Sequence, residues 1–517
     1  MSKTSYIIGI DAGTSMTKAV AFDLNGKELA QSSRRTRTST PHTSWIEADM
    51  DFVWEDVLGC VKNLIAENGE PLSIGITSTG DGTWMMDASG RPVRPGILWC
   101  DGRAQAEVNE MHSSGVVKKA YPLSGTSIFT GTQAAQIRWL ERHEPDALQR
   151  AAVIFHEKDW LLYRFTGEIS SDATDECLTN IDLIKREYDD SLLSIQGISA
   201  YRGKFPALRP TFRNVAPTTS AVTTELGLSH PVMVAAGPMD VSAHALGVGA
   251  IKHGQGSSVL GTAGLHQVAM DKTNIDPENM SGMTLCHCVD KVWLRLVAAM
   301  IATPNLDWAL KVFNVPREKQ SDYEALEREL RKIPIGCEGV LFHPYIFPGG
   351  ERGPFVKTTA KGSFTGINQL QTRYHMIRAV YEGVALSTVD CFRHMPVKPY
   401  MVLLSGGGAK SEFWSQMIAD GLGLPVMIPT GTEYGAKGAA INSAVAGSVF
   451  ASYEEATQAM IRHERTYEPD PSRMERYSEL YELYKSGYRM QMAYWDQRAK
   501  LLDSWEAKRD QDQGEGR

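Results

Sequence analysis

The sequence predicts an α/β protein built from two large domains. The chain has 517 residues, too many for one ordinary domain, and 42% of them are hydrophobic, enough for substantial cores. Short apolar runs alternate with helical periodicity through residues 1–110. Near Ile251 the N-terminal pattern restarts, with an apolar run, a glycine-threonine turn and a second apolar run. We therefore expect two domains built on related plans.

The charge and cysteine content narrow the class of protein. A formal net charge of −8 argues against nucleic acid or an anionic membrane as the main partner. The seven cysteines are scattered, which is typical of reduced thiols in the cytoplasm. The N-terminus lacks an apolar signal core, and the most apolar stretch, 232–251, is interrupted by Pro238, Asp240 and His244. We expect a cytoplasmic protein without a membrane span.

Residues 6–23 (YIIGIDAGTSMTKAVAFD) are the most informative segment. The apolar runs 7–10 and 19–22 predict two buried strands joined by a tight polar turn. A carboxylate beside hydroxyl and amide donors suits a phosphate tail with its metal ion. An ordinary hairpin with a polar turn is the alternative. The candidate ligands are Asp11 for Mg²⁺ and Thr14, Ser15 and Lys18 for the phosphates.

Further along, periodicity predicts strands and helices in alternation. We expect strands over 73–77, 232–236, 257–260 and 400–404, and helices over 52–68, 133–143, 146–152, 241–246, 453–462 and 473–505.

Asp240 is the candidate general base. An apolar strand breaks at Gly237-Pro238 just before it, and a helix of small residues begins just after it. Phosphoryl transfer asks little more of a base than its position, and this position lies where the backbone can come close to a ligand. Asp is also among the best helix N-caps, which is the alternative role, and the two roles can hold together.

Two glycine-rich turns in the second half are candidates for nucleotide binding. Gly261 and Thr262 follow an apolar run, as the N-terminal turn does. Residues 405–414 (SGGGAKSEFW) join a predicted strand to a helix that ends near Leu422, so a flat ring or a phosphate could lie against bare backbone there. The segment is neither GxGxxG nor a Walker loop, and a packing turn is the alternative.

Two polar clusters predict a pocket for a small polyol. Such a ligand needs carboxylates for its hydroxyl donors and an aromatic wall for its carbon face. Asp81 and Trp84 come from residues 80–84 (GDGTW), and Asp101 and Arg103 follow closely. A structural ion pair is an equal alternative for Asp101 and Arg103.

Taken together, these segments resemble the FGGY carbohydrate kinases. The resemblance covers residues 5–485, and several motifs occur in the order and spacing of that family. They are DAGTSMTKAVAFD, SWIEADMDFVW, WCDGRA, GPMDVSAHALG, GTAG, HPYIFPGGERGP and SGGGAKSEFW.

The resemblance implies two actin-like (ribonuclease H-like) domains with an ATP and substrate cleft between them. It implies transfer of the γ-phosphate of ATP, with Mg²⁺, to a polyol or ketose hydroxyl. Residues 1–249 would bind the substrate and carry the catalytic Asp, 250–490 would bind ATP, and 491–517 would form a helix end and a charged tail. Family members are often dimers, so a homodimer is compatible with the resemblance, although no interface can be read from the sequence.

The resemblance also implies roles for single residues. Asp11 and Thr14 would lie at the metal and phosphates, Asp240 would be the general base, Gly261 and Thr262 would hold the β- and γ-phosphates, and Gly407, Gly408 and Ala409 would flank the adenosine, with Ser411 near the ribose.

The predicted substrate pocket differs from those of some relatives. Gly80-Asp81 stands where glycerol kinases carry Arg-Glu and xylulose kinases carry Met-His. GDGTW, together with NLDW at 305–308 and GERGPF, is most similar to erythritol kinases, whereas RWLERHEPDAL also resembles L-xylulose kinases. We expect ATP-dependent phosphorylation of a polyol, with erythritol the first candidate and L-xylulose or a related pentulose the alternative. A non-catalytic actin-like sugar sensor is a third reading, which the presence of Asp11, Thr14 and Asp240 disfavours.

Overall fold

The computed structural model describes residues 5–514 and divides the chain into two compact units. Within the described residues, unit 1 comprises 5–255, 269–295 and 429–462, and unit 2 comprises 256–268, 296–428 and 463–514. Unit 1 is thus assembled from segments that lie far apart in the sequence.

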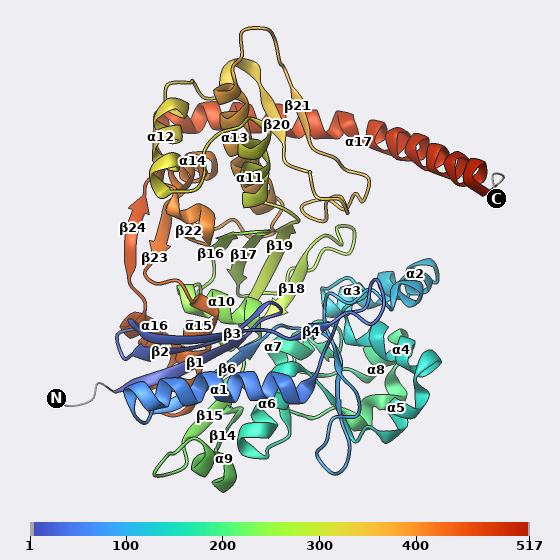
Figure 1. Cartoon of the computed structure of the whole chain (residues 1–517), viewed down its shortest axis with the longest axis vertical. Coiled ribbons are helices and arrows are strands. Elements are labelled where there is room, and N and C mark those ends of the chain that lie inside the picture. Colours follow the sequence, from blue (N-terminus) through green and yellow to red (C-terminus); the bar gives the residue numbers. More distant parts are fainter. Residues whose placement is uncertain (1–4, 515–517) are drawn as a thin grey trace. The chain divides into compact units, whose positions relative to one another are not determined.

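A mixed sheet forms the centre of unit 1 (Figure 1). Its strands run in the order β14-β15-β6-β1-β2-β3. Neighbours β1–β2, β2–β3 and β14–β15 are antiparallel, whereas β1–β6 and β6–β15 are parallel. The strands are β1 (Tyr6–Ala12), β2 (Met16–Asp23), β3 (Glu28–Arg35), β6 (Ser73–Ser78), β14 (Val215–Pro217) and β15 (Met233–Ala236).

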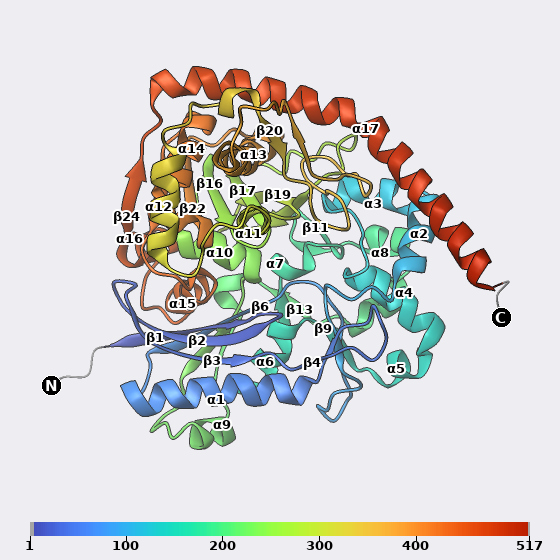
Figure 2. The ribbon, with the colours of Figure 1, turned by 45° about the horizontal axis from the view of Figure 1, so that its top comes forward.

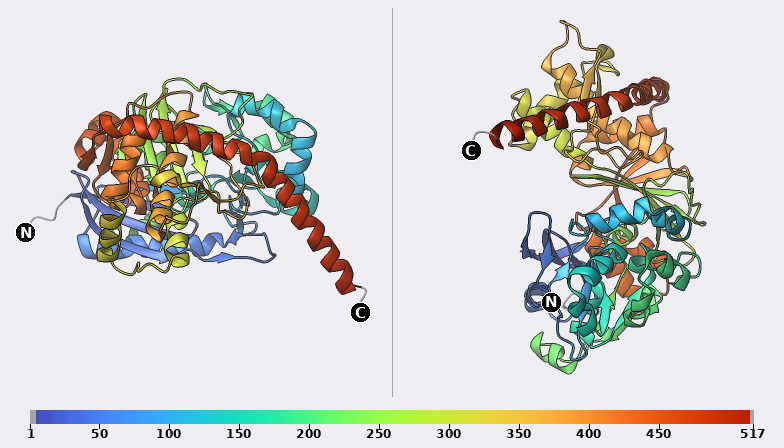
Figure 3. Two further views of the ribbon diagram at one scale, coloured as in Figure 1. Left: turned by 90° about the horizontal axis from the view of Figure 1, so that it is seen from above. Right: turned by 90° about the vertical axis from the view of Figure 1, so that its right-hand side faces the viewer.

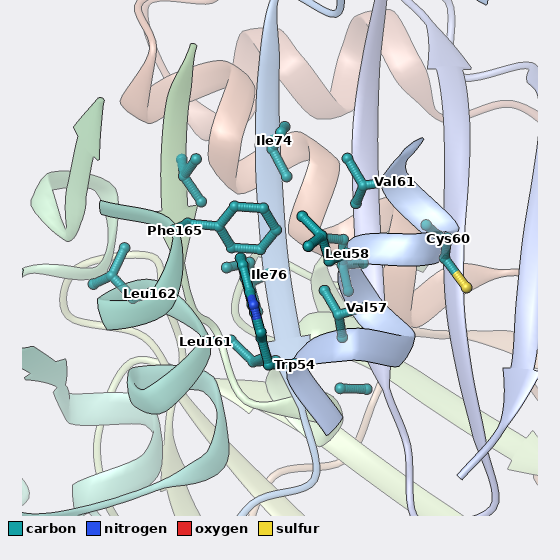
Figure 4. Close-up of a cluster of buried hydrophobic side chains, with 14 of the residues drawn as sticks. Trp54, Val57, Leu58, Cys60, Val61, Ile74, Ile76, Leu161, Leu162 and Phe165 are labelled. Carbon is teal, nitrogen blue, oxygen red and sulfur yellow. The ribbon is translucent and has the colours of Figure 1, made fainter. Parts of the chain in front are cut away.

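Both faces of this sheet are covered. Alternate residues of β1 point to opposite faces, so Ile8 and Ile10 enter one core and Ile7 enters another. On the first face lie α1 (Met50–Asn68) and α6 (Glu157–Thr166), where Trp54 packs edge-on against Phe165 with ring centroids 4.7 Å apart. Figure 4 shows these two side chains between the helices and strand β6.

The second face is covered by α15 (Tyr434–Ala446), which also packs on α10 (Asp240–Val248). Glycine makes this close approach possible. A Cβ on Gly9 of β1 would lie 1.9 Å from the Ala436 carbonyl oxygen, and a Cβ on Gly438 would lie 1.9 Å from that of Ala243. Figure 2 shows α15 beside β1 and β2.

The other elements of unit 1 are mostly short and flank this sheet. A helical cluster with its own apolar core includes α4, which matches the predicted helix residue for residue. The remaining elements are β4 (Thr38–Ser39), β5 (Glu47–Ala48), β7 (Trp84–Met86), β8 (Gly96–Ile97), α2 (Gln105–Ser113), α3 (Val116–Ser124), α4 (Gln133–His143), α5 (Pro145–Arg150), β9 (Val153–Phe155), β10 (Ser170–Asp172), α7 (Ala173–Glu176), β11 (Ile181–Asp182), β12 (Glu187–Tyr188), α8 (Asp190–Gln196), η1 (Ser199–Lys204), β13 (Ala207–Arg209), η2 (Thr211–Arg213), α9 (Ser220–Glu225), β18 (Met283–Cys286) and α16 (Tyr453–Met460).

Unit 2 repeats the strand plan of unit 1. Its strands run in the order β19-β17-β16-β22-β23-β24. Three strands that are consecutive within the unit are thus followed by three added strands, as in β3-β2-β1-β6-β15-β14 of unit 1. β16 and β17 are antiparallel, and β22 and β23 are parallel. The strands are β16 (Gln255–Leu260), β17 (Gly264–Met270), β19 (Trp293–Ala299), β22 (Met401–Ser405), β23 (Val426–Pro429) and β24 (His463–Tyr467).

Helices of unit 2 pack around the buried helix α13 (Arg373–Arg393) and the long α17 (Pro471–Gly514), which Figure 3 shows as one continuous ribbon. α17 buries Tyr477, Tyr481, Tyr484 and Tyr488, one helical turn apart. The remaining elements are α11 (Thr303–Val312), α12 (Gln320–Leu330), η3 (Cys337–Gly339), β20 (Leu341–His343), β21 (Ser363–Thr365), η4 (Gly407–Lys410) and α14 (Glu412–Leu422).

In residues 5–514, no helix is long and apolar enough to cross a membrane.

Candidate active site

Three carboxylates lie where neighbouring strands of unit 1 end. Asp11 is near the end of β1, Asp81 follows β6, and Asp240 follows β15. Because β1, β6 and β15 run parallel to one another, their carboxyl ends meet at the same edge of the sheet. The topology therefore brings together three residues that are up to 229 positions apart.

Asp240 is the first residue of α10, and the backbone around it is held from several sides. The Thr77 hydroxyl donates to the Pro238 carbonyl at 2.6 Å, and the Met239 amide donates to the Thr174 hydroxyl at 3.0 Å. Met239, not Asp240, occupies the N-cap position, so the N-cap alternative is not observed. The Asp240 carboxylate instead accepts from the amide of Val241 at 2.7 Å.

The electrostatics of this edge favour protonated or cation-bound carboxyl groups. Burial, together with repulsion from Asp11 and Asp175, raises the pKa of Asp240 to about 7. Burial raises the pKa of Asp11 to about 6, with Lys18 opposing and Glu433 adding to the rise. The site thus holds more negative potential than its own cations neutralise.

Asp81 sits in a constrained turn. Its φ is 61°, in the left-handed region that few residues other than glycine adopt, and only 6% of the residue is exposed. Its amide donates to Asp175 at 3.3 Å, and its carbonyl lies 3.4 Å from His156 Nδ1. Burial is the main reason that the pKa of Asp81 lies well above its ordinary value.

Glu157 is a fourth carboxylate at this edge that sequence reasoning missed. It opens α6, is 4% exposed, and accepts a hydrogen bond from the Thr79 hydroxyl at 2.9 Å. Burial, with repulsion from Asp11, Asp175 and Asp240, raises its pKa to about 8. The sequence feature that could have identified Glu157 is a His-Glu pair directly after a short strand, at the start of a helix.

The turn between β1 and β2 presents Thr14 and Ser15, both part of the predicted phosphate site. The indole Nε1 of Trp99 donates to the Thr14 hydroxyl at 2.9 Å. Trp99 is 44% exposed, which is unusual for a tryptophan, and it was not among the predicted site residues. Lys18 points to Glu433 at the start of α15, with Nζ 2.8 Å from Oε2.

The other residues predicted for the substrate pocket have side chains that are buried in the protein interior. Trp84 is 1% exposed and belongs to the core beneath the sheet. Arg103 binds Asp101 at 2.9 Å and Glu47 at 2.7 Å, with both its own side chain and that of Asp101 fully buried. Asp101 also accepts from the Ile46 amide at 2.6 Å. This geometry favours the structural ion pair over direct contact with a ligand.

The donor set of unit 1 fits Mg²⁺ bound together with phosphate. Mg²⁺ is usually held by one or two carboxylates plus substrate phosphates rather than by a cage of protein ligands. Within residues 5–514, no group of three or more His, Cys, Asp and Glu side chains is arranged as such a cage. Asp11 and Asp240 are oxygen donors with uncompensated negative potential.

In unit 2, the predicted turn Gly261-Thr262 joins β16 to β17. The Gly261 carbonyl accepts from both the amide, at 2.9 Å, and the hydroxyl, at 2.8 Å, of Thr303 at the start of α11. The Ala302 amide donates to the Thr262 carbonyl at 2.9 Å. Thr262 itself is exposed. The start of α11 therefore fixes this turn and leaves its Thr side chain accessible.

The three consecutive glycines after β22 have two different roles. A Cβ on Gly406 would lie 2.7 Å from the Leu260 carbonyl oxygen, and a Cβ on Gly408 would lie 2.4 Å from the Leu260 side chain. A Cβ on Gly407 would meet nothing within 4 Å. Packing thus explains two of the glycines, and the third faces open space. Ala409 is buried beneath the turn.

A pocket of about 650 Å³ opens beside this turn, entirely within unit 2. Its volume lies in the range of small-molecule sites. Gly407, Gly408 and Ser411 line it, as does Thr303, which connects it to the Gly261-Thr262 turn. Part of the wall comes from α12, with Tyr323, Glu324, Glu327 and Arg328, and from Arg331 just after this helix.

The sequence matches two family models that together cover most of the chain. Residues 6–247 match the N-terminal domain of the FGGY family of carbohydrate kinases, and residues 256–447 match its C-terminal domain.

Individual relatives are similar over nearly their whole length. The chain is 28% identical to an erythritol kinase of Brucella abortus (strain 2308), covering 96% of this chain and 98% of that protein. It is 30% identical to a xylulose kinase of Escherichia coli (strain K12), covering 93% and 98%. The structure of a xylulose kinase from Rhodospirillum rubrum superposes with a TM-score of 0.86 at 27% identity, over 95% of this chain and 100% of that one.

These matches agree with the α/β architecture of both units, which is the actin-like, ribonuclease H-like fold of sugar kinases. The chain belongs to the FGGY family of carbohydrate kinases and is an ATP-dependent sugar or polyol phosphotransferase.

Proposed function

We propose that the protein phosphorylates a short polyol, with erythritol as the first candidate substrate and Asp240 as the general base. The observation that carries this proposal is the shared edge of the sheet, where Gly80-Asp81 follows β6, Asp240 follows β15, and a Cβ on Gly80 would lie 2.5 Å from the sulfur of Met239. The turn that would bind the substrate and the group that would deprotonate it are therefore packed side by side.

Asp240 is suited to accept a proton at neutral pH. A base works best when its pKa lies near the working pH, and the pKa of Asp240 is raised to about 7. The carboxylate would take the proton of the substrate hydroxyl as the hydroxyl oxygen attacks the γ-phosphorus of ATP. Asp11 and Thr14 would hold the Mg²⁺ and phosphates, and the bound ion would neutralise the negative charge of the phosphate oxygens.

Asp81 and the exposed face of Trp99 are the proposed contacts to the polyol. A carboxyl group can pair with the substrate hydroxyls, and an indole can cover the carbon chain. Trp84, Asp101 and Arg103, which were predicted as substrate ligands, would support the pocket from behind, since their side chains are buried. Ser15 and Lys18 flank the phosphate turn, where Lys18 would offset part of the phosphate charge.

The nucleotide is proposed to bind on unit 2. Gly261 and Thr262 would hold the β- and γ-phosphates, and the pocket beside Gly407 and Gly408 would take the adenosine, with Ala409 forming the floor. In this proposal, 1–249 is the substrate domain and 250–490 the nucleotide domain, with 491–517 as the end of the last helix and the tail, of which 515–517 lie outside the described residues. The seven free cysteines suit a cytoplasmic enzyme, for which a homodimer stays a prediction.

A substrate panel tests the proposal directly. The full-length protein is incubated with ATP, Mg²⁺ and one acceptor at a time: erythritol, glycerol, D-xylulose, L-xylulose or D-ribulose, and ADP release is followed. We expect the largest kcat/KM with erythritol. A larger value with either xylulose would instead assign the substrate class of the xylulose kinase relatives. ATP hydrolysis that no acceptor stimulates would overturn the proposed function.

A further inference from the structure

The wall of the unit 2 pocket carries a carboxylate that none of the motifs includes. Glu327 lies in α12 and is one of the residues that line the pocket beside the glycine turn. Its side chain is partly buried, and burial is the main reason that its pKa lies above its ordinary value. An acidic group kept partly desolvated at a pocket wall needs a hydrogen-bond donor.

One oxygen of this carboxylate is already occupied. Oε1 accepts from the Ser411 hydroxyl at 2.6 Å and from the Tyr381 hydroxyl at 3.4 Å. Within the described residues, Oε2 accepts no hydrogen bond from a side chain or amide. Ser411 and Tyr381 therefore fix the orientation of the carboxylate and leave its second oxygen for a donor in the pocket.

Ser411, which the family resemblance places near the ribose, has a hydroxyl that both donates and accepts a hydrogen bond. It donates to Glu327 and accepts from the Trp414 amide at 2.9 Å, as the N-cap of α14. A hydroxyl that already donates and accepts has little capacity left for a sugar. The group beside it that still can accept is Glu327.

The place of Glu327 along the pocket suits a ribose. At one end, Thr303 lines the pocket and donates to Gly261 in the proposed phosphate turn. Gly408 contacts Leu260, the residue just before that turn, and Ser411 follows three residues later. A nucleotide whose phosphates lie at Gly261-Thr262 and whose base lies deeper in the pocket presents its ribose between these two ends.

We infer, given the proposed nucleotide site, that Glu327 is a specificity-determining residue that accepts a hydrogen bond from one ribose hydroxyl of ATP. Because Oε1 already accepts from Ser411 and Tyr381, this contact is made through Oε2. The enzyme then prefers ribonucleotides over deoxyribonucleotides through this single contact. A site built to hydrogen-bond a hydroxyl rejects the analogue that lacks it, since its own polar group is left unpaired.

The test compares ATP with 2′-deoxy-ATP and 3′-deoxy-ATP as phosphate donors, at saturating acceptor. For the wild type, one of the two analogues is expected to have a kcat/KM lower than that of ATP by about 10- to 100-fold, the range for a hydrogen bond to a charged group. In Glu327→Ala and Glu327→Gln, the ratio of kcat/KM for ATP to kcat/KM for that analogue should fall toward one. The change should come from a higher KM for ATP, with kcat unchanged. The analogue that responds identifies the hydroxyl.

A matched control comes from the same helix. Glu329 lies outside the pocket and pairs with Lys332 at 2.7 Å on the surface, so Glu329→Ala should keep the wild-type ratio. Calorimetric titration of each variant with ATP and with the responsive analogue gives the ratio of the two dissociation constants. This ratio reports the preference for ATP without turnover. If phosphoryl transfer is absent but ATP binding still discriminates against the analogue, the proposed function fails and the inference stands. If Glu327→Ala retains the wild-type ratio, the inference is wrong whatever the acceptor.

Discussion

Asp240 is the residue on which the proposed chemistry depends most directly. Asp240→Asn keeps the size of the side chain and an oxygen that can accept from the Val241 amide, so α10 should start at the same place. The amide cannot take a proton, and we expect kcat to fall by about three orders of magnitude, within the range for loss of general-base catalysis. Steady-state kinetics with the preferred acceptor give this number.

ATP titration by calorimetry provides the control for Asp240→Asn, because an intact nucleotide site should keep its dissociation constant within a few-fold. A variant that turns over near the wild-type rate would show that another group accepts the proton, and Glu157 would then be the first to examine.

Glu157 predicts how stability depends on pH. Its pKa is raised from 4.5 to about 8 in the folded protein. The folded state therefore holds a proton that the unfolded chain has released, so this contribution to stability is complete below pH 4.5 and is lost as the pH rises to 8. Glu157→Gln mimics the protonated form at every pH. We expect the variant to melt ~2–4 °C above the wild type at pH 8.5 and close to it at pH 5, in scans without ligand.

Glu351 on unit 2 serves as a comparison for Glu157, since burial also raises its pKa, to about 7, but its Oε1 accepts from three backbone amides. Glu351→Ala removes this acceptor oxygen and should therefore destabilise the protein at both pH values. A melting difference for Glu157→Gln that does not change between pH 5 and 8.5 would contradict the raised pKa.

For single residues, the sequence predicted where the site carboxylates lie in the fold better than it predicted which side chains contact one another. Asp11, Asp81 and Asp240 stand out because each follows an apolar run, and parallel strands then bring them together. Trp99 and Glu157 were not predicted as site residues because their roles depend on hydrogen bonds to distant residues. Trp99 bonds to Thr14, and Glu157 bonds to Thr79. Local sequence does not encode such pairings.

Among the elements, the packing of α15 on β1 sets the strictest requirement. The helix reaches the strand so closely that Gly9→Ala would place its Cβ 1.9 Å from the Ala436 carbonyl oxygen, where no side chain can yield. We expect a loss of ~3 kcal/mol in the free energy of unfolding, because a helix or a strand must shift in a well-packed core. Chemical denaturation followed by circular dichroism measures it.

Gly203→Ala is the matched control for Gly9→Ala. A Cβ at Gly203, in η1, would meet nothing within 4 Å, and the change should alter stability by less than ~0.5 kcal/mol. Equal effects of the two substitutions would mean that α15 does not pack this closely on β1 in solution.

The helices with one apolar face were predictable, and α15 was not. α1 and α4 lie on the surface of unit 1 and show the periodic pattern that marks a half-buried helix. α15 is YGAKGAAINSAVA, with Ala436 to Ala444 buried on all sides. A helix of small residues without a polar face indicates burial but not its partner. Its place between β1 and α10 became clear only in three dimensions.

The whole molecule shows why sequence position and structural unit are different things. The predicted limits at 249/250 and 490/491 describe functional domains and stay a prediction. The compact units are arranged otherwise, since residues 429–462 pack in unit 1 although they follow most of unit 2 in the chain. Unit 1 therefore cannot be completed from the N-terminal half alone.

This arrangement predicts the behaviour of fragments. A fragment of residues 1–255 lacks α15 and α16, so Ile7, Val20 and Phe22 on the second face of the sheet lose the helices that bury them. Exposed apolar patches of this kind lead to association. We expect the fragment to be insoluble, or to sediment as aggregates that bind a hydrophobic dye, and to lack a cooperative melt. Co-expression with residues 256–517, which supply both helices, should recover soluble protein that purifies as one complex. A monomeric 1–255 fragment with a sharp melting transition would show instead that the sheet of unit 1 is stable without α15, and that the close packing at Gly9 is not needed to hold it together.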